Sequence, residues 1–572
     1  MRDMKQSKRG GGERGSTLIV GIASLVFIIV PMSGLAVDVG IIYAVRSRLQ
    51  ASVDGAALAA ARALVLGQTI TSQESTARQN AVNWFYANFP SGTWATTGTV
   101  MGTSNVVIDD NSVPNLAKIQ ITATTVVPTW FLKYLSFNST NLGVIGQASR
   151  RDVVAMMVLD RSGSMNSTAG ACASLISSGK IFTGQFAPGR DRIGLISFSD
   201  NVYIHSAPST SFQATLGYTA SYGSGTGELD TITCAGGTST PMALSWGFNE
   251  IYQLNLPGAF NTLLLETDGL PNTLLQNSYN SAANTVNLSA TSTCVDKNNK
   301  TYKPVGANPG GGFNNAASIP AWTTTAPAGG MGAGSYNWAG APGGVIPTGM
   351  VHQIYSSDPN QTDSGQTHYF YMTFGPYYSN PTKYNNSVFL TNTTAKGCIF
   401  DAAPQTVFSP YSGTDFAYFP STDVFGNQLL PSNHAAYQTA ITTSGGNITV
   451  NWQNYHNGAL NATDDIAYRM RTDPTIPTTV YAIGLGGNTG SGSSPPDTIL
   501  LQRVANDPNA DLFWSSPETG PQYPACSTEP TCITYTSGAN AQPQGVFAFS
   551  FNQAQLAAAF RSIASQVLRL SE

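Results

Sequence analysis

Short apolar runs alternate with segments of helical periodicity through the larger, carboxyl-terminal part of the chain. Residues 153–159 are seven consecutive apolar residues, too few for an ordinary helix and rich in valine, which is typical of a strand buried on both faces. Further strands are expected at residues 192–198, 261–267 and 480–486. Helices are expected at residues 166–186, 242–248, 464–470, 499–505 and 555–568. Strands that alternate with helices predict an α/β fold with a doubly wound parallel sheet.

Oxygen-bearing side chains follow the ends of two of these strands. One strand ends in an Asp-x-Ser-x-Ser sequence and the other in Thr-Asp-Gly, and a Gly-Gly-Thr turn lies between them along the chain. The side chains concerned are Asp160, Ser162, Ser164, Thr238 and Asp268. Because the carboxyl ends of parallel strands meet at one edge of a sheet, we expect these side chains to converge. Their oxygens are hard ligands suited to Mg²⁺ or Mn²⁺, whereas Asp-x-Ser-x-Ser alone also fits helix capping.

This set of residues, in this order, resembles the metal-ion-dependent adhesion site (MIDAS) of von Willebrand factor type A domains, which have a Rossmann-like, doubly wound sheet. The resemblance implies that the five residues bind one Mg²⁺ or Mn²⁺ ion and that an Asp or Glu carboxylate of a protein partner binds to the metal. In related A domains, ligation shifts the last helix, which here would be residues 555–568. The predicted output is therefore binding, and we predict that the chain is not an enzyme.

The amino-terminal region contains a long apolar segment. Residues 17–37 carry no charge, and 21 helical residues are enough to cross the roughly 30 Å of bilayer hydrocarbon. Basic residues precede the segment and Asp38 follows it, so the positive-inside rule places residues 1–16 in the cytoplasm as a basic tail and the rest of the chain outside. We predict one transmembrane helix over residues 17–43. A cleaved signal peptide is the alternative, and both interpretations export the large domain.

Helical periodicity continues beyond the apolar segment. Apolar residues recur every three or four positions at Ile42, Val45, Leu49, Val53, Ala56, Ala60 and Leu64. Two interpretations stand: a stalk that rises from the bilayer, or an amphipathic helix packed on its own domain. Strands are expected at residues 105–108, 118–123 and 143–146, and a short helix at residues 128–135. Residues 44–150 are therefore predicted to form a helical stalk and a small α/β spacer.

A second resemblance lies in the amino-terminal region. Its sequences Arg-Gly-Ser at residues 14–16, AVDVG at residues 36–40 and RLQASVDGAALAAA at residues 48–61 look like those of TadE/TadG-like proteins of the bacterial tight-adherence (Flp pilus) system. TadG-like members share an anchor, a β-rich spacer and a von Willebrand A domain. The resemblance implies a single-pass protein of the bacterial inner membrane with a cytoplasmic amino terminus, a periplasmic or extracellular main domain, and a pilus or envelope component as partner. Unlike pseudopilin-type relatives, the chain has no glutamate shortly after Gly15, which argues against prepilin-peptidase cleavage.

Composition excludes some partners and marks an insertion. Charged residues make up 10% of the 572 residues and the net charge is −4, so nothing indicates binding to nucleic acid. Residues 275–460 lose the strand–helix alternation and are rich in Gly, Asn, Thr, Tyr and Pro. A structureless loop of this length is improbable in a compact domain, so we predict a β-rich insertion in a von Willebrand A domain of residues 151–572. The insertion is either a contact surface near the metal loops or a solvated decoration.

Six cysteines in an exported chain predict disulfide bonds. Fifteen pairings exist for six cysteines, and the sequence does not choose among them. Position along the chain suggests, as a hypothesis, the pairs Cys172–Cys234, Cys294–Cys398 and Cys526–Cys532. The first of these would tie two of the metal loops together.

Motifs for other functions are weak or missing. The histidines are scattered, and there is no HExxH sequence, no GxSxG nucleophile elbow and no phosphate loop, which leaves a hydrolase as a distant third hypothesis. A weak Ca²⁺ site has EF-hand offsets but lacks the required glycine, and its candidate ligands are Asp507, Asn509, Asp511 and Glu518. A surface adhesin for host matrix or glycan is the main alternative to a role in pilus assembly, because it would use the same metal site.

Overall fold

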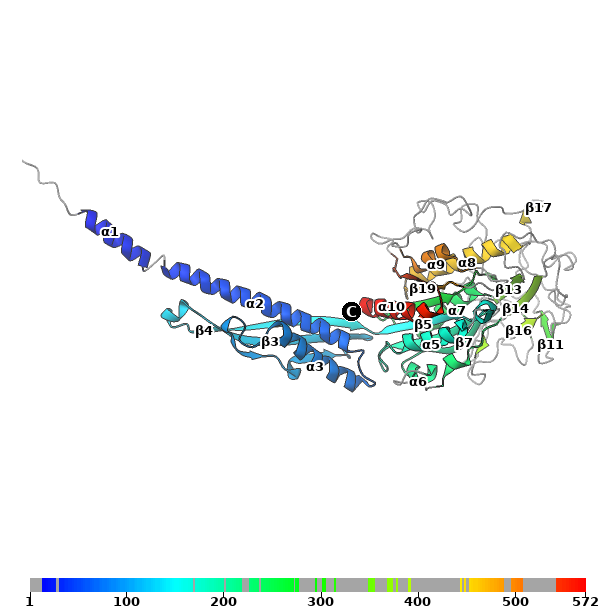
Figure 1. The fold of residues 1–572 in the computed structure, drawn as a ribbon, viewed down its shortest axis with the longest axis horizontal. Helices are drawn as coiled ribbons and strands as arrows, with labels where there is room; N and C mark the ends of the chain where they lie inside the picture. Colours follow the sequence, from blue (N-terminus) through cyan, green and yellow to red (C-terminus); the bar gives the residue numbers. More distant parts are fainter. Residues whose placement is uncertain are drawn as a thin grey trace, which may run out of the picture. The chain divides into compact units, whose positions relative to one another are not determined.

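The computed structural model describes residues 13–26, 30–167, 170–199, 202–218, 226–235, 238–271, 273–276, 452–487, 495–507 and 542–571, together with short strands between residues 294 and 448. The chain divides into two compact units, Met1–Arg151 and Asp152–Ser571 (Figure 1).

The first unit combines helices with an antiparallel sheet. Its helices are α1 (Glu13–Ser24), α2 (Val30–Ala63) and α3 (Ile70–Asn88), with short 3-10 turns η2 (Thr93–Ala95), η3 (Thr103–Asn105) and η4 (Leu132–Leu135). Its strands are β1 (Thr97–Val100), β2 (Val106–Asp109), β3 (Leu116–Pro128) and β4 (Ser139–Arg151). Strands β3 and β4 pair antiparallel over their whole length, from Leu116↔Arg151 to Pro128↔Ser139. They are longer than the sequence pattern predicted.

Helix α2 packs on its own unit. Its apolar face is buried with side chains of α3, β3 and β4 in one hydrophobic core. The approach to the sheet is close, since a Cβ added at Gly146 would lie 2.8 Å from Val53. Of the two interpretations of residues 42–64, the structure therefore supports the packed amphipathic helix and not a free stalk.

The predicted transmembrane helix of residues 17–43 falls on α1 and on the first part of α2, and residues 27–29 of it lie outside the described residues. Helix α1 has 12 residues, and α2 carries Asp38 and further charges from Arg46 onward. Among the helices that the structure describes, none is both long enough and apolar enough to cross a bilayer.

The second unit is built on a seven-stranded sheet in the order β15-β7-β6-β5-β8-β19-β20. Its strands are β5 (Val153–Asp160), β6 (Arg192–Phe198), β7 (Val202–Ser209), β8 (Phe260–Thr267), β15 (Tyr377–Tyr378), β19 (Thr479–Leu485) and β20 (Phe547–Ser550). Strands β6, β5, β8, β19 and β20 run parallel, as predicted. All eight residues of the central strand β5 are buried, which is why its sequence is a continuous apolar run.

The predicted parallel sheet is present, but one edge of it departs from the parallel direction, because β7 pairs antiparallel with β6. The two strands are separated by only residues 199–201, whereas a parallel pair needs a crossover of about a dozen residues or more. Because β15 pairs parallel with β7, these two strands run opposite to the other five strands of the sheet.

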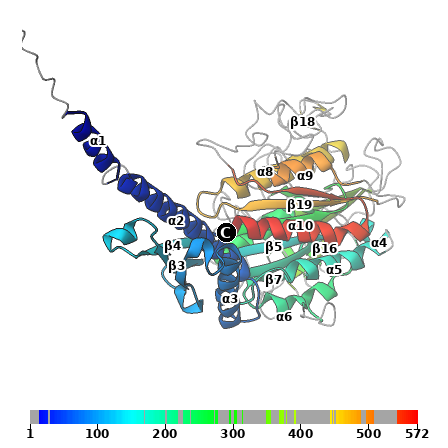
Figure 2. The same ribbon diagram turned by 60° about the vertical axis from the view of Figure 1, so that its left-hand side comes forward.

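Helices cover both faces of the sheet (Figure 2). On one face, α5 (Ala171–Thr183) and α10 (Gln553–Ser571) pack against the odd-numbered side chains of β5, such as Met157. On the other, α7 (Thr240–Leu254), α8 (Trp452–Thr472) and α9 (Thr498–Ala505) pack against its even-numbered side chains, such as Met156. Strand alternation thus divides the core into two layers.

The described segments of the predicted insertion before residue 452 are strands. An antiparallel sheet contains β9 (Thr273–Gln276), β13 (Thr348–Ile354), β14 (His368–Thr373) and β16 (Phe389–Thr391). Smaller sheets contain β10 (Cys294–Val295), β11 (Thr301–Pro304) and β12 (Phe313–Asn314), and β17 (Thr443–Ser444) with β18 (Asn447–Ile448). The predicted end of the insertion at residue 460 is too late, because α8 already begins at Trp452.

Candidate metal site

The candidate site is built on two neighbouring parallel strands that end together. Strand β5 ends at Asp160 and β8 at Thr267, and their register pairs Leu159 with Glu266. The Asp160 carboxylate is fixed from both strands: its Oδ1 accepts a hydrogen bond from the backbone N–H of Ser162 at 2.7 Å, and its Oδ2 accepts one from the Thr267 hydroxyl at 2.5 Å. Its orientation is therefore set before any ligand binds.

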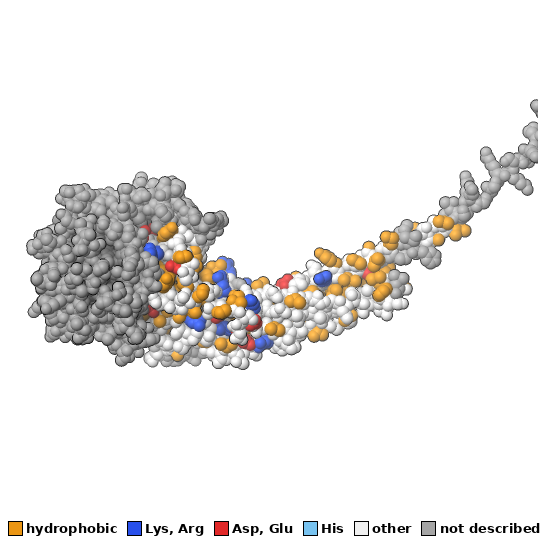
Figure 3. Space-filling view, turned by 180° about the vertical axis from the view of Figure 1, so that it is seen from behind, with side chains coloured by type: hydrophobic (Ala, Val, Ile, Leu, Met, Phe, Trp, Pro, Cys, Tyr) orange, Lys and Arg blue, Asp and Glu red, His pale blue; other side chains and the backbone are white. Residues whose placement is uncertain are grey.

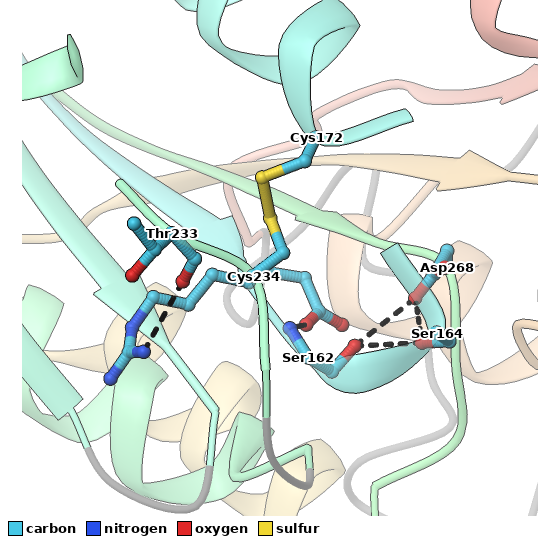
Figure 4. The surroundings of a disulfide bond; sticks show 8 residues. Ser162, Ser164, Cys172, Thr233, Cys234 and Asp268 are labelled. Atoms are coloured by element: carbon cyan, nitrogen blue, oxygen red, sulfur yellow. Dashed lines mark hydrogen bonds between the residues drawn. A yellow bond between two sulfur atoms is a disulfide. The ribbon is translucent and has the colours of Figure 1, made fainter. Parts of the chain in front are cut away.

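Three side-chain oxygens meet next to Asp160. The Ser164 hydroxyl donates to Asp268 Oδ1 at 2.6 Å, and the Ser162 hydroxyl donates to the same oxygen at 3.3 Å. The two serine hydroxyls lie 2.7 Å apart, as Figure 4 shows. Ser164 lies in the short helix α4 (Gly163–Ser167), which follows the end of β5. Side chains from two loops thus converge on one point.

Thr238 comes to the same point from a third loop. A Cβ placed on Gly269 would lie 3.5 Å from the Thr238 hydroxyl and 3.8 Å from the Ser164 hydroxyl, so both hydroxyls flank Gly269. The backbone N–H of Ala235 donates to the carbonyl of Arg161 at 2.7 Å, which ties this loop to the first one. The structure therefore brings all five predicted residues to the carboxyl edge of the sheet.

A disulfide bond reinforces this arrangement. Cys172 in α5 is bonded to Cys234, which precedes Thr238 by four residues, as Figure 4 shows. The predicted Cys172–Cys234 pair is therefore confirmed. The other two predicted pairs involve Cys398, Cys526 and Cys532, which lie outside the described residues.

Burial determines the electrostatics of the site. Asp160 and Asp268 have relative exposures of 0% and 1%. Burial raises the pKa of Asp160, and burial together with the charge of Asp160 raises the pKa of Asp268 to about 7. Two buried carboxylates and three neutral hydroxyls form an all-oxygen ligand set, which fits a hard divalent cation such as Mg²⁺ or Mn²⁺.

Two residues beside the site were missed by the sequence analysis. Thr267 holds Asp160, and Glu266 is fully buried in β8. Neither Glu266 carboxylate oxygen has a hydrogen-bond partner within the described part of the chain. Burial, followed by the charges of Asp160 and Asp268, raises the Glu266 pKa well above its ordinary value. The available signal was a glutamate at the end of an otherwise apolar strand.

The described part of the chain also bears on metal sites built from carboxylate, histidine and cysteine side chains. Within the described ranges, no group of three or more His, Cys, Asp or Glu side chains is placed to hold a metal ion. A metal at the sheet edge therefore depends on the serine and threonine hydroxyls. Of the predicted Ca²⁺ ligands, Asp507 accepts a hydrogen bond from the backbone N–H of Phe547, and the other three lie outside the described residues.

Comparison with known families bears on the amino-terminal region. Residues 15–63 match the family model described as putative Flp pilus-assembly TadE/G-like. The predicted TadE/TadG-like resemblance is confirmed for these residues, and the order of the chain's parts fits a TadG-like protein. No curated protein matches the chain.

Several solved structures are similar to the chain at low identity. The von Willebrand factor domain of the type V pili tip protein Mfa5 from Porphyromonas gingivalis is 14% identical, with 74% of this chain and 98% of that one covered and a TM-score of 0.32. The PilB minor pilin from Streptococcus sanguinis is 10% identical, with 83% and 79% covered and a TM-score of 0.29. A von Willebrand factor type A protein from Catenulispora acidiphila is 13% identical, with 29% and 36% covered and a TM-score of 0.18. At these TM-scores the likenesses carry no functional argument.

Proposed function

We propose that this chain is a membrane-anchored, extracytoplasmic binding protein that captures a carboxylate of a protein partner through a MIDAS-type metal site during Flp pilus assembly or anchoring. The observation that carries the proposal is the meeting of Ser162, Ser164 and Asp268 oxygens within 3.3 Å of one another, beside the fixed carboxylate of Asp160. The TadE/G-like match of residues 15–63 supports the pilus assignment.

The ligand set favours a divalent cation for electrostatic reasons. Asp160 and Asp268 bring two negative charges into a buried region, and the hydroxyls add no charge. A bound Mg²⁺ or Mn²⁺ ion would neutralise these charges and offer a coordination position to a further carboxylate. Hydrogen bonds from the Thr267 hydroxyl and from the backbone N–H of Ser162 fix the orientation of the Asp160 carboxylate.

The partner's approach follows from the exposure of the five residues. Asp160, Ser162, Thr238 and Asp268 are buried, whereas Ser164 is partly exposed. A partner's carboxylate therefore enters past Ser164, at the start of α4.

The membrane anchor in this proposal is the charge-free segment of residues 17–37, which continues the topology expected from the basic amino terminus. Apolar side chains of its described parts are exposed, including Leu18, Ile19, Val20 and Met32 at 63–68%. Exposed apolar surface of this extent is energetically unfavourable in water and favourable in lipid. The anchor would sit in the bacterial inner membrane with the second unit on the outer side.

The metal proposal is tested by Mn²⁺ titration of the full-length chain in nanodiscs, followed by electron paramagnetic resonance. We expect one bound ion in the wild type and none in Asp160→Ala or Asp268→Asn. Asp473→Asn is the matched control. Asp473 accepts backbone hydrogen bonds in the turn before β19, at the end of the strands opposite to the site, and the asparagine oxygen can accept the same bonds. Unchanged affinity in both site variants, with intact circular dichroism, overturns the metal site.

The partner proposal is tested separately by crosslinking in intact cells with and without a chelator. Recovery of pilus or envelope components that depends on divalent metal supports pilus assembly or anchoring. Metal-dependent binding of purified host matrix or glycan, without such components, supports the surface-adhesin alternative. Neither result requires a hydrolytic activity.

A further inference from the structure

The connection between β3 and β4 carries four exposed aromatic side chains. Trp130, Phe131, Tyr134 and Phe137 are 52%, 43%, 80% and 65% exposed. They lie within residues 129–138, which we call the hairpin tip. So many large apolar rings at one turn mark an interaction surface, since loop ends in water are normally polar.

The hairpin tip has a defined conformation. The backbone N–H of Thr129 donates to the carbonyl of Asn138 at 3.1 Å, and that of Phe137 donates to Leu132 at 3.1 Å. Ser136 closes the η4 turn in the left-handed region, with φ of 69°. The rings are therefore presented by a folded turn.

Contacts with helix α2 fix the position of the hairpin tip along that helix. The Asp38 carboxylate accepts three backbone hydrogen bonds, from Trp130 and Phe131 at 2.9 Å and from Leu132 at 2.6 Å. The Phe131 ring lies against Gly34, one helical turn earlier, where an added Cβ would be 2.5 Å from the ring. These contacts place the tip where the charge-free segment of residues 17–37 ends.

The same contacts cover the only charge on this stretch of the sequence. Between Gly15 and Val45, Asp38 is the single side chain that is charged at neutral pH, and it is 1% exposed. The neighbouring surface of α2 is apolar, with Met32, Leu35 and Tyr43 exposed. Figure 3 shows hydrophobic side chains gathered over the amino-terminal part of α2 and the hairpin beside it. Three N–H donors let a carboxylate stay close to hydrocarbon at reduced cost.

The hairpin tip also carries a single cation suited to a headgroup layer. The Lys133 ammonium lies 5.5 Å from the centre of the Tyr134 ring. Trp and Tyr are enriched at membrane–water interfaces because one end of the ring is apolar and the other polar, and lysine extends its ammonium toward phosphate. Aromatic rings, a lysine and a shielded aspartate at the end of an apolar helix together match a lipid surface better than a protein partner.

We propose that the hairpin tip lies in the outer headgroup layer of the bilayer and fixes the height at which the first unit stands on the membrane. This inference rests on the proposed membrane anchor. It does not depend on the metal site.

The experiment uses the full-length chain in phospholipid vesicles containing lipids brominated near the headgroup. Bromine quenches tryptophan fluorescence at short range. The part of the emission that brominated lipid quenches in the wild type but not in Trp130→Phe therefore reports the depth of the Trp130 ring. Trp84→Phe is the control, because Trp84 contacts Gly55, 17 residues after Asp38 and therefore roughly 25 Å farther along the helix. We expect the quenchable emission to fall in Trp130→Phe and to remain unchanged in Trp84→Phe.

Flotation of the same vesicles separates the two proposals. If the chain floats with lipid but Trp130→Phe leaves the quenchable emission unchanged, the hairpin-tip proposal is overturned and the anchor stands. A chain that fails to float overturns the anchor and this inference with it. In lipid-free detergent, shielding of Trp130 that increases with protein concentration would show that the rings contact a second copy of the chain. This result also overturns the proposal.

Discussion

The Thr267 hydroxyl donates a 2.5 Å hydrogen bond to the Asp160 carboxylate, across the ends of two parallel strands. Thr267 is not among the five predicted ligands, and it stands directly before Asp268, which is. One strand end therefore supplies both a ligand and the group that orients the ligand of its neighbour. Groups of this kind usually change metal affinity by one to two orders of magnitude when removed.

Replacing Thr267 with valine keeps the side-chain shape and removes the donor. We expect the Mn²⁺ affinity to fall by roughly 10-fold, because Asp160 loses the bond that fixes one of its oxygens. Thr267→Ser retains the hydroxyl and is the matched control. Titration by electron paramagnetic resonance compares the variants, and equal affinities for the valine and serine forms would show that this bond does not matter.

Metal binding is expected to stabilise the second unit. A ligand present at 100 times its dissociation constant, and bound only by the folded state, adds about 2.7 kcal/mol to the free energy of unfolding. Thermal unfolding followed by near-ultraviolet circular dichroism should therefore shift upward with Mg²⁺ and downward with EDTA. In Asp268→Asn the shift should vanish, while in Asp473→Asn it should persist. A shift of equal size in both variants would place the stabilising ion elsewhere.

Loss of the Cys172–Cys234 bond should affect both stability and the metal loop. The bond joins cysteines 62 residues apart, and chain entropy for a loop of that length predicts a loss of about 4 kcal/mol in the free energy of unfolding for the double alanine variant. Because Cys234 stands four residues before Thr238, Mn²⁺ affinity should fall as well. Urea unfolding and Mn²⁺ titration measure the two effects. Reduction of the wild type should reproduce them, and a stable variant with unchanged affinity contradicts the prediction.

Acid should destabilise the second unit through His205. Burial lowers the His205 pKa below its ordinary 6.5, although the neighbouring Glu228 acts in the opposite direction. The folded state thus favours the neutral ring, so this stability is present above about pH 6.5 and is lost as the pH falls toward the folded pKa. Urea unfolding at several pH values should show a steeper acid loss in the wild type than in His205→Gln. Parallel pH profiles would remove His205 as the cause.

Much of the fold could be predicted because its signals are local. The apolar run of β5 and the strand end at Asp160 lie within a dozen residues, and the helix of α10 shows its period directly. Asp268 was predicted as a site residue for the same reason, because it follows the carboxyl end of a neighbouring parallel strand. Strand β20 was not predicted, because it has only four residues and its strand conformation depends on pairing with β19.

By itself, the sequence determined the strand–helix alternation of the second unit, the five oxygen-bearing residues, and the TadE/TadG-like segment near the amino terminus. These depend on periodicity, strand ends and short motifs, all of which are local. Tertiary structure alone decided that Thr267 orients Asp160, that Glu266 is buried beside the site, and that Asp38 holds the β3–β4 turn. Each of these joins residues far apart in the chain or depends on burial, and only packing sets the distances and the exclusion of water that give such groups their effect.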